Sequence, residues 1–119
     1  MQNPKNLVLF AVARDVAILT YRLTAAFPAH ERFGLISQMR RAAVSIGSNV
    51  AEGCGREGRR GLVAFLHIAL GSASELEFQC ELAVALGMCA ENDAAACLQE
   101  ISRAKRMLSR LIKALRPEA

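Results

Sequence analysis

The sequence predicts an all-α protein: an antiparallel, up-down-up-down four-helix bundle formed by a single domain over residues 1–119. Three observations support this fold class. The chain contains only 3 prolines and 8 glycines, so few positions break a helix. Hydrophobic residues make up 53% of the composition, which is enough to bury one core. Apolar residues also recur at steps of three and four along the predicted helices.

The first predicted helix begins at Asn3-Pro4 and ends near Ala26. Asparagine is a good N-cap, and proline suits the first helical position because its missing N–H would have no partner there. Phe27-Pro28 breaks the helix, since the residue before a proline disfavours the helical region. The apolar residues of this helix are Leu9, Val12, Val16, Leu19 and Leu23.

The second predicted helix covers residues 34–56 and has two organised sides. Steps of three and four place one set of residues along one side of a helix. The apolar set is Met39, Ala43, Ile46 and Val50. The polar set is Gln38, Arg41, Ser45, Asn49, Glu52 and Arg56. A helix with two organised sides has a second partner besides its own core.

Three interpretations of the polar side stay open. The first is a structural network with the third helix, in which a buried Arg41–Glu75 pair fixes the register. The network residues are Gln38, Arg41, Ser45, Asn49 and Glu52 on the second helix and Glu75 on the third, where Ser72 and Gln79 also face the second helix. The second interpretation is a contact between subunits, and the third is a ligand or catalytic site.

The third predicted helix covers residues 62–86 and ends at Gly87, a typical C-terminal stop. The preceding connection, residues 53–61, holds four glycines but lacks the GxxxxGK[ST] pattern of a phosphate-binding loop. Residues 71–74 are small, which allows a neighbouring helix to approach closely.

The fourth predicted helix starts after Asn92, an N-cap candidate with Asp93 in the first turn, and Pro117 ends it. Its apolar residues follow a heptad. One position of the heptad holds Ala94, Ile101, Leu108 and Leu115, and the other holds Cys97, Ala104 and Leu111. Short connections between helices of similar length favour antiparallel neighbours.

Several classes of protein are excluded by what the sequence lacks. No stretch of 18 apolar residues is free of charge, so we expect no transmembrane helix, no membrane partner and a cytoplasmic protein without a signal peptide. The cysteines form no CxxC pair and have no zinc-ligand spacing with a histidine, so we expect reduced, partly buried thiols and no metal. These cysteines are Cys54, Cys80, Cys89 and Cys97.

The sequence also argues against catalysis. His30 and His67 lie far apart, and no Glu-x-x-His pair of a di-iron bundle is present. The serines have no histidine at a predictable distance. We therefore expect no enzyme activity and no cofactor.

Charge is strongly segregated beneath a net charge of +4. Residues 61–102 contain six acidic residues and no lysine or arginine, whereas residues 103–116 contain six basic residues and no acid. In an up-down-up-down bundle the second connection and the end of the fourth helix meet, so one end is basic. The candidate nucleic-acid contacts are Arg56, Arg59, Arg60, Arg103, Arg106, Arg110, Lys113 and Arg116. Two interpretations stay open: a solvated helix face that complements the helix dipole, or an electrostatic footprint for a polyanion.

Several motifs carry a family resemblance. The matching segments are Phe27-Pro28, Glu31, Phe33-Gly34-Leu35, Ser37-Gln38-Met39-Arg40-Arg41-Ala42, Ser45-Ile46, Asn49-Val50-Ala51-Glu52-Gly53, Phe65-Leu66, Ile68-Ala69, Gly71-Ser72, Glu75-Leu76-Glu77 and Leu82-Ala83. In this order the chain resembles the small bacterial four helix bundle protein family, also called 23S rRNA intervening-sequence proteins. The resemblance implies a four-helix bundle that forms a homo-oligomer, a ring-like homopentamer. The similar accessory proteins of diversity-generating retroelements bind nucleic acid and a reverse transcriptase.

We therefore expect a non-catalytic oligomer that binds nucleic acid, with RNA favoured over DNA, mainly through phosphates. The alternative is a protein-interaction scaffold that binds a partner protein and no nucleic acid. A third possibility, a small-molecule-binding bundle, requires a pocket near residues 71–74.

Overall fold

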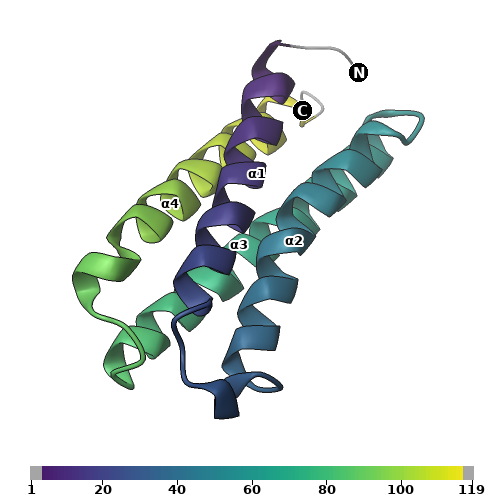
Figure 1. The fold of residues 1–119 in the computed structure, drawn as a ribbon. Helices are drawn as coiled ribbons and strands as arrows, with labels where there is room; N and C mark the ends of the chain where they lie inside the picture. Colours follow the sequence, from purple (N-terminus) through teal and green to yellow (C-terminus); the bar gives the residue numbers. More distant parts are fainter. Residues whose placement is uncertain (1–3, 117–119) are drawn as a thin grey trace.

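Four helices form an antiparallel bundle in the computed structural model, which describes residues 4–116 (Figure 1). The elements are α1 (Pro4–Thr24), the short 3-10 helix η1 (Ala29–Glu31), α2 (Leu35–Cys54), α3 (Arg59–Ala85) and α4 (Glu91–Ala114). Within the described chain, each helix packs on its neighbours in sequence and α1 also packs on α4, while the diagonal pairs stay apart. The predicted up-down-up-down bundle is confirmed.

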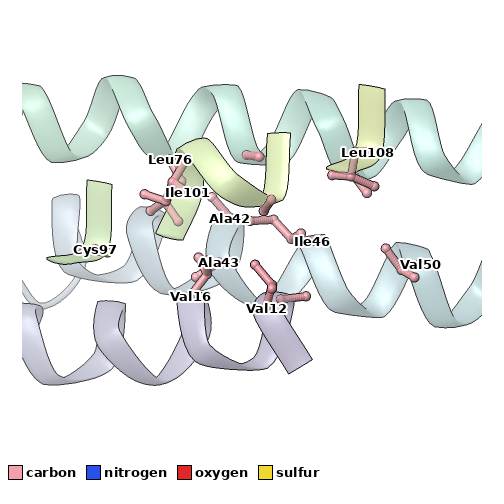
Figure 2. Close-up of a cluster of buried hydrophobic side chains, with 14 of the residues drawn as sticks. Val12, Val16, Ala42, Ala43, Ile46, Val50, Leu76, Cys97, Ile101 and Leu108 are labelled. Atoms are coloured by element: carbon pink, nitrogen blue, oxygen red, sulfur yellow. The ribbon is translucent and has the colours of Figure 1, made fainter. Parts of the chain in front are cut away.

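The core runs along the axis of the bundle, and Figure 2 shows part of it in close-up. All four helices contribute fully buried side chains, such as Val16 of α1, Ile46 of α2, Leu76 of α3 and Ile101 of α4. The predicted apolar side of α2 is entirely buried: Met39, Ala43, Ile46 and Val50 are at most 1% exposed. Sequence periodicity alone therefore located the inward side of this helix.

The first helix ends at Thr24, slightly before the predicted end. The Thr24 hydroxyl donates to the carbonyl oxygen of Thr20 at 2.8 Å, and the Phe27 side chain is buried after the helix end. The predicted cap Asn3 and the predicted stop Pro117 lie outside the described residues.

The connection between α2 and α3 is shorter than predicted. It covers only residues 55–58: α2 ends at Cys54, two residues before its predicted end, and α3 begins at Arg59, three residues before its predicted start. Gly58 adopts a φ of 85°, which glycine accepts without the Cβ strain of other residues. Two of the glycines assigned to a flexible loop are therefore helical.

Gly87 terminates α3 as predicted, with a φ of 76°. The N–H of Gly87 donates to the Val84 oxygen at 3.0 Å, and the N–H of Met88 donates to the Ala83 oxygen at 2.9 Å. This pair of bonds is a Schellman motif, which satisfies carbonyl groups left free at the helix end.

The fourth helix corrects two predictions. Its N-cap is Ala90 rather than Asn92, and the Asp93 carboxylate accepts a hydrogen bond from the Ala90 N–H at 3.1 Å. Near the other end Ile112 is buried, whereas Leu111 and Leu115 are only half-buried. A straight helix has 3.6 residues per turn, so a strict heptad drifts out of the core after several turns.

The third helix is more apolar on its outward side than a solvated helix requires. Ile68, Phe78 and Leu86 are all at least half exposed. Among the described helices, α3 alone has the length and apolar composition that a membrane-spanning helix needs. Core helices of soluble bundles pass the same test, and α3 packs against both α2 and α4.

Candidate nucleic-acid interface

The connection between α2 and α3 and the C-terminal end of α4 lie at the same end of the bundle (Figure 1). A depression of about 280 Å³ joins them, because Arg56 and Arg59 line it together with Leu115. We call this the basic end and define it by Arg56, Arg59, Arg60, Arg110, Lys113 and Arg116. All six residues are exposed.

The Arg56 side chain already has two partners within the protein. Its guanidinium lies 4.9 Å from the centre of the Phe65 ring, and Nη2 lies 3.8 Å from Oε1 of Glu52. Cation–π contact and the i,i+4 carboxylate both restrain the side chain. The other five cations of the basic end form no ion pair with any residue of the described chain. Their charge is therefore available to an anionic partner.

Two of the predicted contact residues lie away from the basic end. Arg103 is 13 residues before Arg116, or roughly 20 Å at 1.5 Å per residue. Its Nη1 lies 3.8 Å from Oε2 of Glu100. Arg106 lies on the flank and donates to the Ser102 hydroxyl at 2.7 Å. Arg103 is thus remote from the basic end, whereas Arg106 lies one helical turn from Arg110 and lines the same groove.

A shallow groove on the α3–α4 flank leads toward the basic end. Its volume is about 440 Å³, and Arg106 and Arg110 line it together with Lys105 and Glu77. Nζ of Lys105 lies 2.9 Å from Oε1 of Glu77, and both side chains are about two thirds buried. This ion pair cancels one of the positive charges in the groove and joins α3 to α4.

The opposite end of the bundle has a different balance. It combines the α1–α2 turn with the α3–α4 turn, as Figure 1 shows. Its charged residues are Glu31, Glu81, Glu91 and Asp93 together with Arg22, Arg32 and Arg40, whose guanidinium is bonded to Thr24 at the end of α1. Acids outnumber arginines there, so the separation of charge expected from the sequence persists along the long axis of 47 Å.

The polar side of α2 divides into two parts, and the buried Arg41–Glu75 pair is wrong. Both residues are exposed and form no ion pair with each other. Because a helical turn holds 3.6 residues, two residues that are three or four positions apart differ in direction by up to about 60° around the helix axis. Arg41 and Glu52 therefore turn outward, whereas Ser45 turns toward α3.

A smaller polar cluster takes the place of that pair. The hydroxyl oxygens of Ser45 and Ser72 lie 2.8 Å apart between α2 and α3. Nδ2 of Asn49 donates to the Ser45 carbonyl oxygen at 2.8 Å and to its hydroxyl at 2.9 Å. Gln38 is exposed and lies outside this cluster. Of the six predicted network residues, Ser45 and Asn49 are joined by hydrogen bonds, and Glu75 accepts one from Gln79 on its own helix at 3.4 Å.

Arg40 is a residue whose role the sequence reasoning missed. Its Nε donates to the Thr24 hydroxyl at 2.9 Å, and its guanidinium lies 4.5 Å from the centre of the Tyr21 ring. These contacts tie α2 to α1. Helical periodicity could have indicated this role, because Arg40 and Gly47 lie on the same side of α2 and Gly47 packs near Ala13 of α1.

The outward side of α2 also carries a broad depression of about 630 Å³. Arg32, Arg40 and Arg41 line it together with Phe33, whose exposed fraction is 90%. The remaining lining residues are Tyr21, Ile36, Ser37, Val44, Ser45 and Ser48. The lining contains no carboxylate, so this surface is both apolar and cationic. Within residues 4–116, no group of three His, Cys, Asp or Glu is placed to hold a metal ion.

Comparison with known proteins places this fold in context. The sequence model of a family described as 23S rRNA-intervening sequence protein matches residues 5–110. A crystal structure from Bacteroides thetaiotaomicron, of a protein with unknown function from the S23 ribosomal protein family, has a TM-score of 0.83. The match covers 92% of this chain and 98% of that chain at 22% identity, which supports the same fold. No curated protein matches this chain.

Proposed function

The chain belongs to the 23S rRNA-intervening sequence protein family, and from that premise we propose a non-catalytic homo-oligomer that binds nucleic acid at its basic end. The observation that carries this proposal is the set of exposed cations at one end of the bundle. Arg59 and Arg60 open α3, while Arg110 and Lys113 lie near the end of α4. Their charges have no ion-pair partner within the described residues.

Phosphate groups are the chemical match for this surface. Clustered arginines neutralise phosphates and release counterions, which gives affinity that is salt-dependent and weakly selective for sequence. The ring of Phe65, which lies beside the basic end, already has Arg56 over its face. Base stacking therefore contributes little at this end, and we take RNA as the first ligand to test.

Homo-oligomer formation is supported by two different apolar surfaces. The depression on α2 is apolar and cationic, with Phe33 and Arg41. The outward side of α3 is apolar and acidic, with Ile68, Phe78 and Glu75 exposed. Two distinct, complementary surfaces on one chain suit a head-to-tail contact, which closes into a ring when the rotation allows. A homopentamer, the ring size implied by the family resemblance, is our proposal.

A ring multiplies a weak phosphate affinity. Cyclic symmetry places the basic ends of all subunits on one rim, so one RNA strand can engage several of them. Each further contact is then intramolecular and benefits from a high effective concentration.

The test is a light-scattering mass of the protein with and without a mixed RNA oligonucleotide, at low and at physiological salt. We expect a ring-sized mass that gains RNA at low salt and releases it at physiological salt. A triple variant, Arg59→Gln, Arg110→Gln and Lys113→Gln, should lose the RNA and keep its mass.

A matched control carries the same loss of charge elsewhere. Arg14, Arg22 and Arg103 are exposed and lie away from the basic end, so their triple change to Gln also lowers the net charge by three. It should retain RNA binding. If both triple variants lost RNA binding equally, net charge alone would explain the effect and the proposed site would be wrong. Undiminished RNA binding by the first variant would also refute the proposed site.

The second candidate function is a protein-interaction scaffold without nucleic-acid binding. The specific observation in its favour is the depression on α2, where Phe33 is 90% exposed beside three arginines. An acidic, amphipathic partner segment fits that chemistry. Salt dependence separates the two functions, because a contact with an apolar centre persists at physiological salt whereas phosphate contacts weaken steeply.

A further inference from the structure

An apolar pocket lies between α1 and α4, at the end of the bundle where Figure 1 shows the beginning of α1 beside the end of α4. Its volume is about 310 Å³. Val8 and Leu9 line it from α1, and Met107, Arg110, Leu111 and Ala114 line it from α4. The nucleic-acid contacts proposed above leave this pocket unused.

The pocket exists because the seam between these two helices is incompletely filled. Leu9 is 1% exposed and forms the floor, whereas Val8, the preceding residue of α1, is 44% exposed. On α4, Met107 and Leu111 are four residues apart, so they lie on one side of the helix, and both are half-buried. Ala114 is exposed and carries only a methyl group, so its side chain does not close the seam from outside.

The chemistry of the lining selects an apolar, unbranched ligand. Among the described residues that line the pocket, five have aliphatic or thioether side chains, and none carries a hydroxyl, an amide or a carboxylate. A ligand there gains free energy by burying CH₂ groups, and a polar group along its length would find no partner. The volume is near the lower limit of ligand pockets, which suits a chain of medium length.

Arg110 is the one charged residue that the described lining contains, and it is exposed at the rim. It also lines the groove on the α3–α4 flank, so its side chain lies on the outer side of α4 between the two hollows. Its guanidinium forms no ion pair within residues 4–116. A guanidinium holds a carboxylate through two parallel hydrogen bonds. One guanidinium matches a single negative charge, whereas a phosphate monoester carries up to about two.

We propose that this pocket binds a medium-chain fatty acid. The alkyl chain lies in the seam between Leu9 and Leu111, and the carboxylate pairs with Arg110 at the rim. Burial of the alkyl chain supplies most of the affinity, because an exposed ion pair contributes little. The ion pair sets the orientation of the ligand and its preference for an anionic head group.

The first experiment measures affinity against chain length. Hexanoate, octanoate, decanoate and octan-1-ol are titrated into the full-length protein by calorimetry, below the concentrations at which they form micelles. We expect one ligand per chain and about tenfold tighter binding for each two added CH₂ groups, until the pocket is full. Octanoate should bind more tightly than octan-1-ol. No saturable binding, or an affinity that does not depend on chain length, would overturn the proposal.

Matched variants on α4 test the two parts of the site separately. Ala114→Phe places a ring at the mouth and should abolish binding of octanoate and octan-1-ol, whereas Ser109→Phe adds the same ring outside the lining and should not. Arg110→Gln should bind both ligands equally, while Lys113→Gln, at an exposed position outside the lining, should keep the preference for octanoate. Undiminished octanoate binding by Ala114→Phe would show that the pocket is not the site.

A photoreactive ligand locates the site in the unaltered chain. A medium-chain fatty acid with a terminal diazirine is bound, irradiated, and followed by trypsin digestion and mass spectrometry. We expect labels on the peptides that cover residues 6–14 of α1 and residues 107–113 of α4. Labels confined to residues 33–40 would place the ligand in the depression on α2 and would contradict the proposal.

Two measurements separate this site from the proposed function. Arg110 also belongs to the basic end, so Ala114→Phe is the informative variant, and it should lose octanoate while it retains RNA. If the unaltered chain bound no RNA, the octanoate titrations would still decide this proposal. Light scattering should give the same mass with and without octanoate; a fall in mass would mean that a second copy of the chain covers the pocket, and the proposal would be wrong.

Discussion

The hydroxyl oxygens of Ser45 and Ser72 lie 2.8 Å apart, between the middle of α2 and the middle of α3. Each side chain is half-buried, and Asn49 donates a second hydrogen bond to the Ser45 hydroxyl at 2.9 Å. Either hydroxyl can be the donor between Ser45 and Ser72, since each oxygen carries one hydrogen and two lone pairs. This contact fixes the register of the helix pair that packs most extensively in the bundle.

The first prediction concerns this hydroxyl pair. Ser72→Ala should lower the free energy of unfolding by about 1 kcal/mol, because it leaves the half-buried Ser45 hydroxyl without its partner on α3. A double-mutant cycle with Ser45→Ala should give a coupling energy of about 0.5–1 kcal/mol. Urea unfolding followed by circular dichroism measures both values. Ser48→Ala, at an exposed position on the same helix, is the control and should change stability little.

The second prediction compares two neighbouring arginines on α2. Arg40→Ala removes the hydrogen bond to Thr24 and the contact with the Tyr21 ring, so it should cost about 1–2 kcal/mol. Arg41→Ala removes an exposed side chain and should cost less than about 0.5 kcal/mol. Thermal unfolding of both variants provides the comparison. Equal destabilisation would show that the contacts of Arg40 contribute nothing specific.

The third prediction uses two glycines inside α2. A Cβ at Gly53 would lie 3.0 Å from Cβ of Phe65 and 3.3 Å from the Leu62 carbonyl oxygen. Gly53→Ala should therefore push α2 away from α3 and destabilise the bundle by about 1–3 kcal/mol. A Cβ at Gly47 meets only Cβ of Ala13 at an ordinary 3.5 Å. Gly47→Ala should raise the free energy of unfolding by up to about 1 kcal/mol, because alanine has the higher helix propensity. The denaturant midpoints of the two variants will show whether each change stabilises or destabilises the bundle.

The fourth prediction concerns the salt dependence of RNA binding at the basic end. For single strands, the logarithm of affinity falls by about 0.7 per phosphate contact for each unit of log salt. The triple change of Arg59, Arg110 and Lys113 to Gln should therefore flatten this slope by about 2 if each cation meets one phosphate. Fluorescence anisotropy titrations over a salt series measure it. A weaker affinity with an unchanged slope would point to an indirect effect on folding or assembly.

The fifth prediction is a pH profile for Cys97. Because the thiolate is the reactive form and the pKa of Cys97 is lowered to about 7, its alkylation rate should rise through neutral pH and level off above it. Cys80→Ala removes the hydrogen bond that lowers this pKa, so the rise should move to higher pH. Cys97 lines a depression of about 350 Å³ together with Arg22, Cys89 and Asp93, and Cys89→Ser serves as the control that keeps the neutral midpoint. Cleavage after glutamate puts Cys80, Cys89 and Cys97 on separate peptides, so mass spectrometry can follow each thiol.

The fold was predictable because its determinants are local. Apolar spacing identified the buried side of α2, and Gly87 identified the end of α3, where a positive φ is required. The small residues at positions 71–74 were only partly informative: Ser72 and Ala73 face neighbouring helices, whereas Gly71 and Ser74 are exposed. Periodicity gives the direction of a side chain to within a sector, which is enough for a core and too coarse for individual contacts.

The polar contacts were beyond that resolution. Arg41 and Ser45 share one line in the sequence, yet only Ser45 reaches α3, because a few tens of degrees of helical phase decide whether a side chain meets a neighbour or solvent. Arg40 and Lys105 form their contacts with residues on other helices, at distances set by how the helices pack. The position of the cations at one end could be predicted from the topology, whereas the ion pair between Arg103 and Glu100 could be seen only in the structure.

The unequal ends of the bundle give the molecule a permanent electric dipole moment along its long axis. Six cations occupy one end, and acids outnumber arginines at the other, across an extent of 47 Å. Such a molecule adsorbs to a negatively charged surface end-on, with all copies in the same orientation. On a cation-exchange resin it should elute later than a protein with the same net charge of +4 spread evenly over its surface.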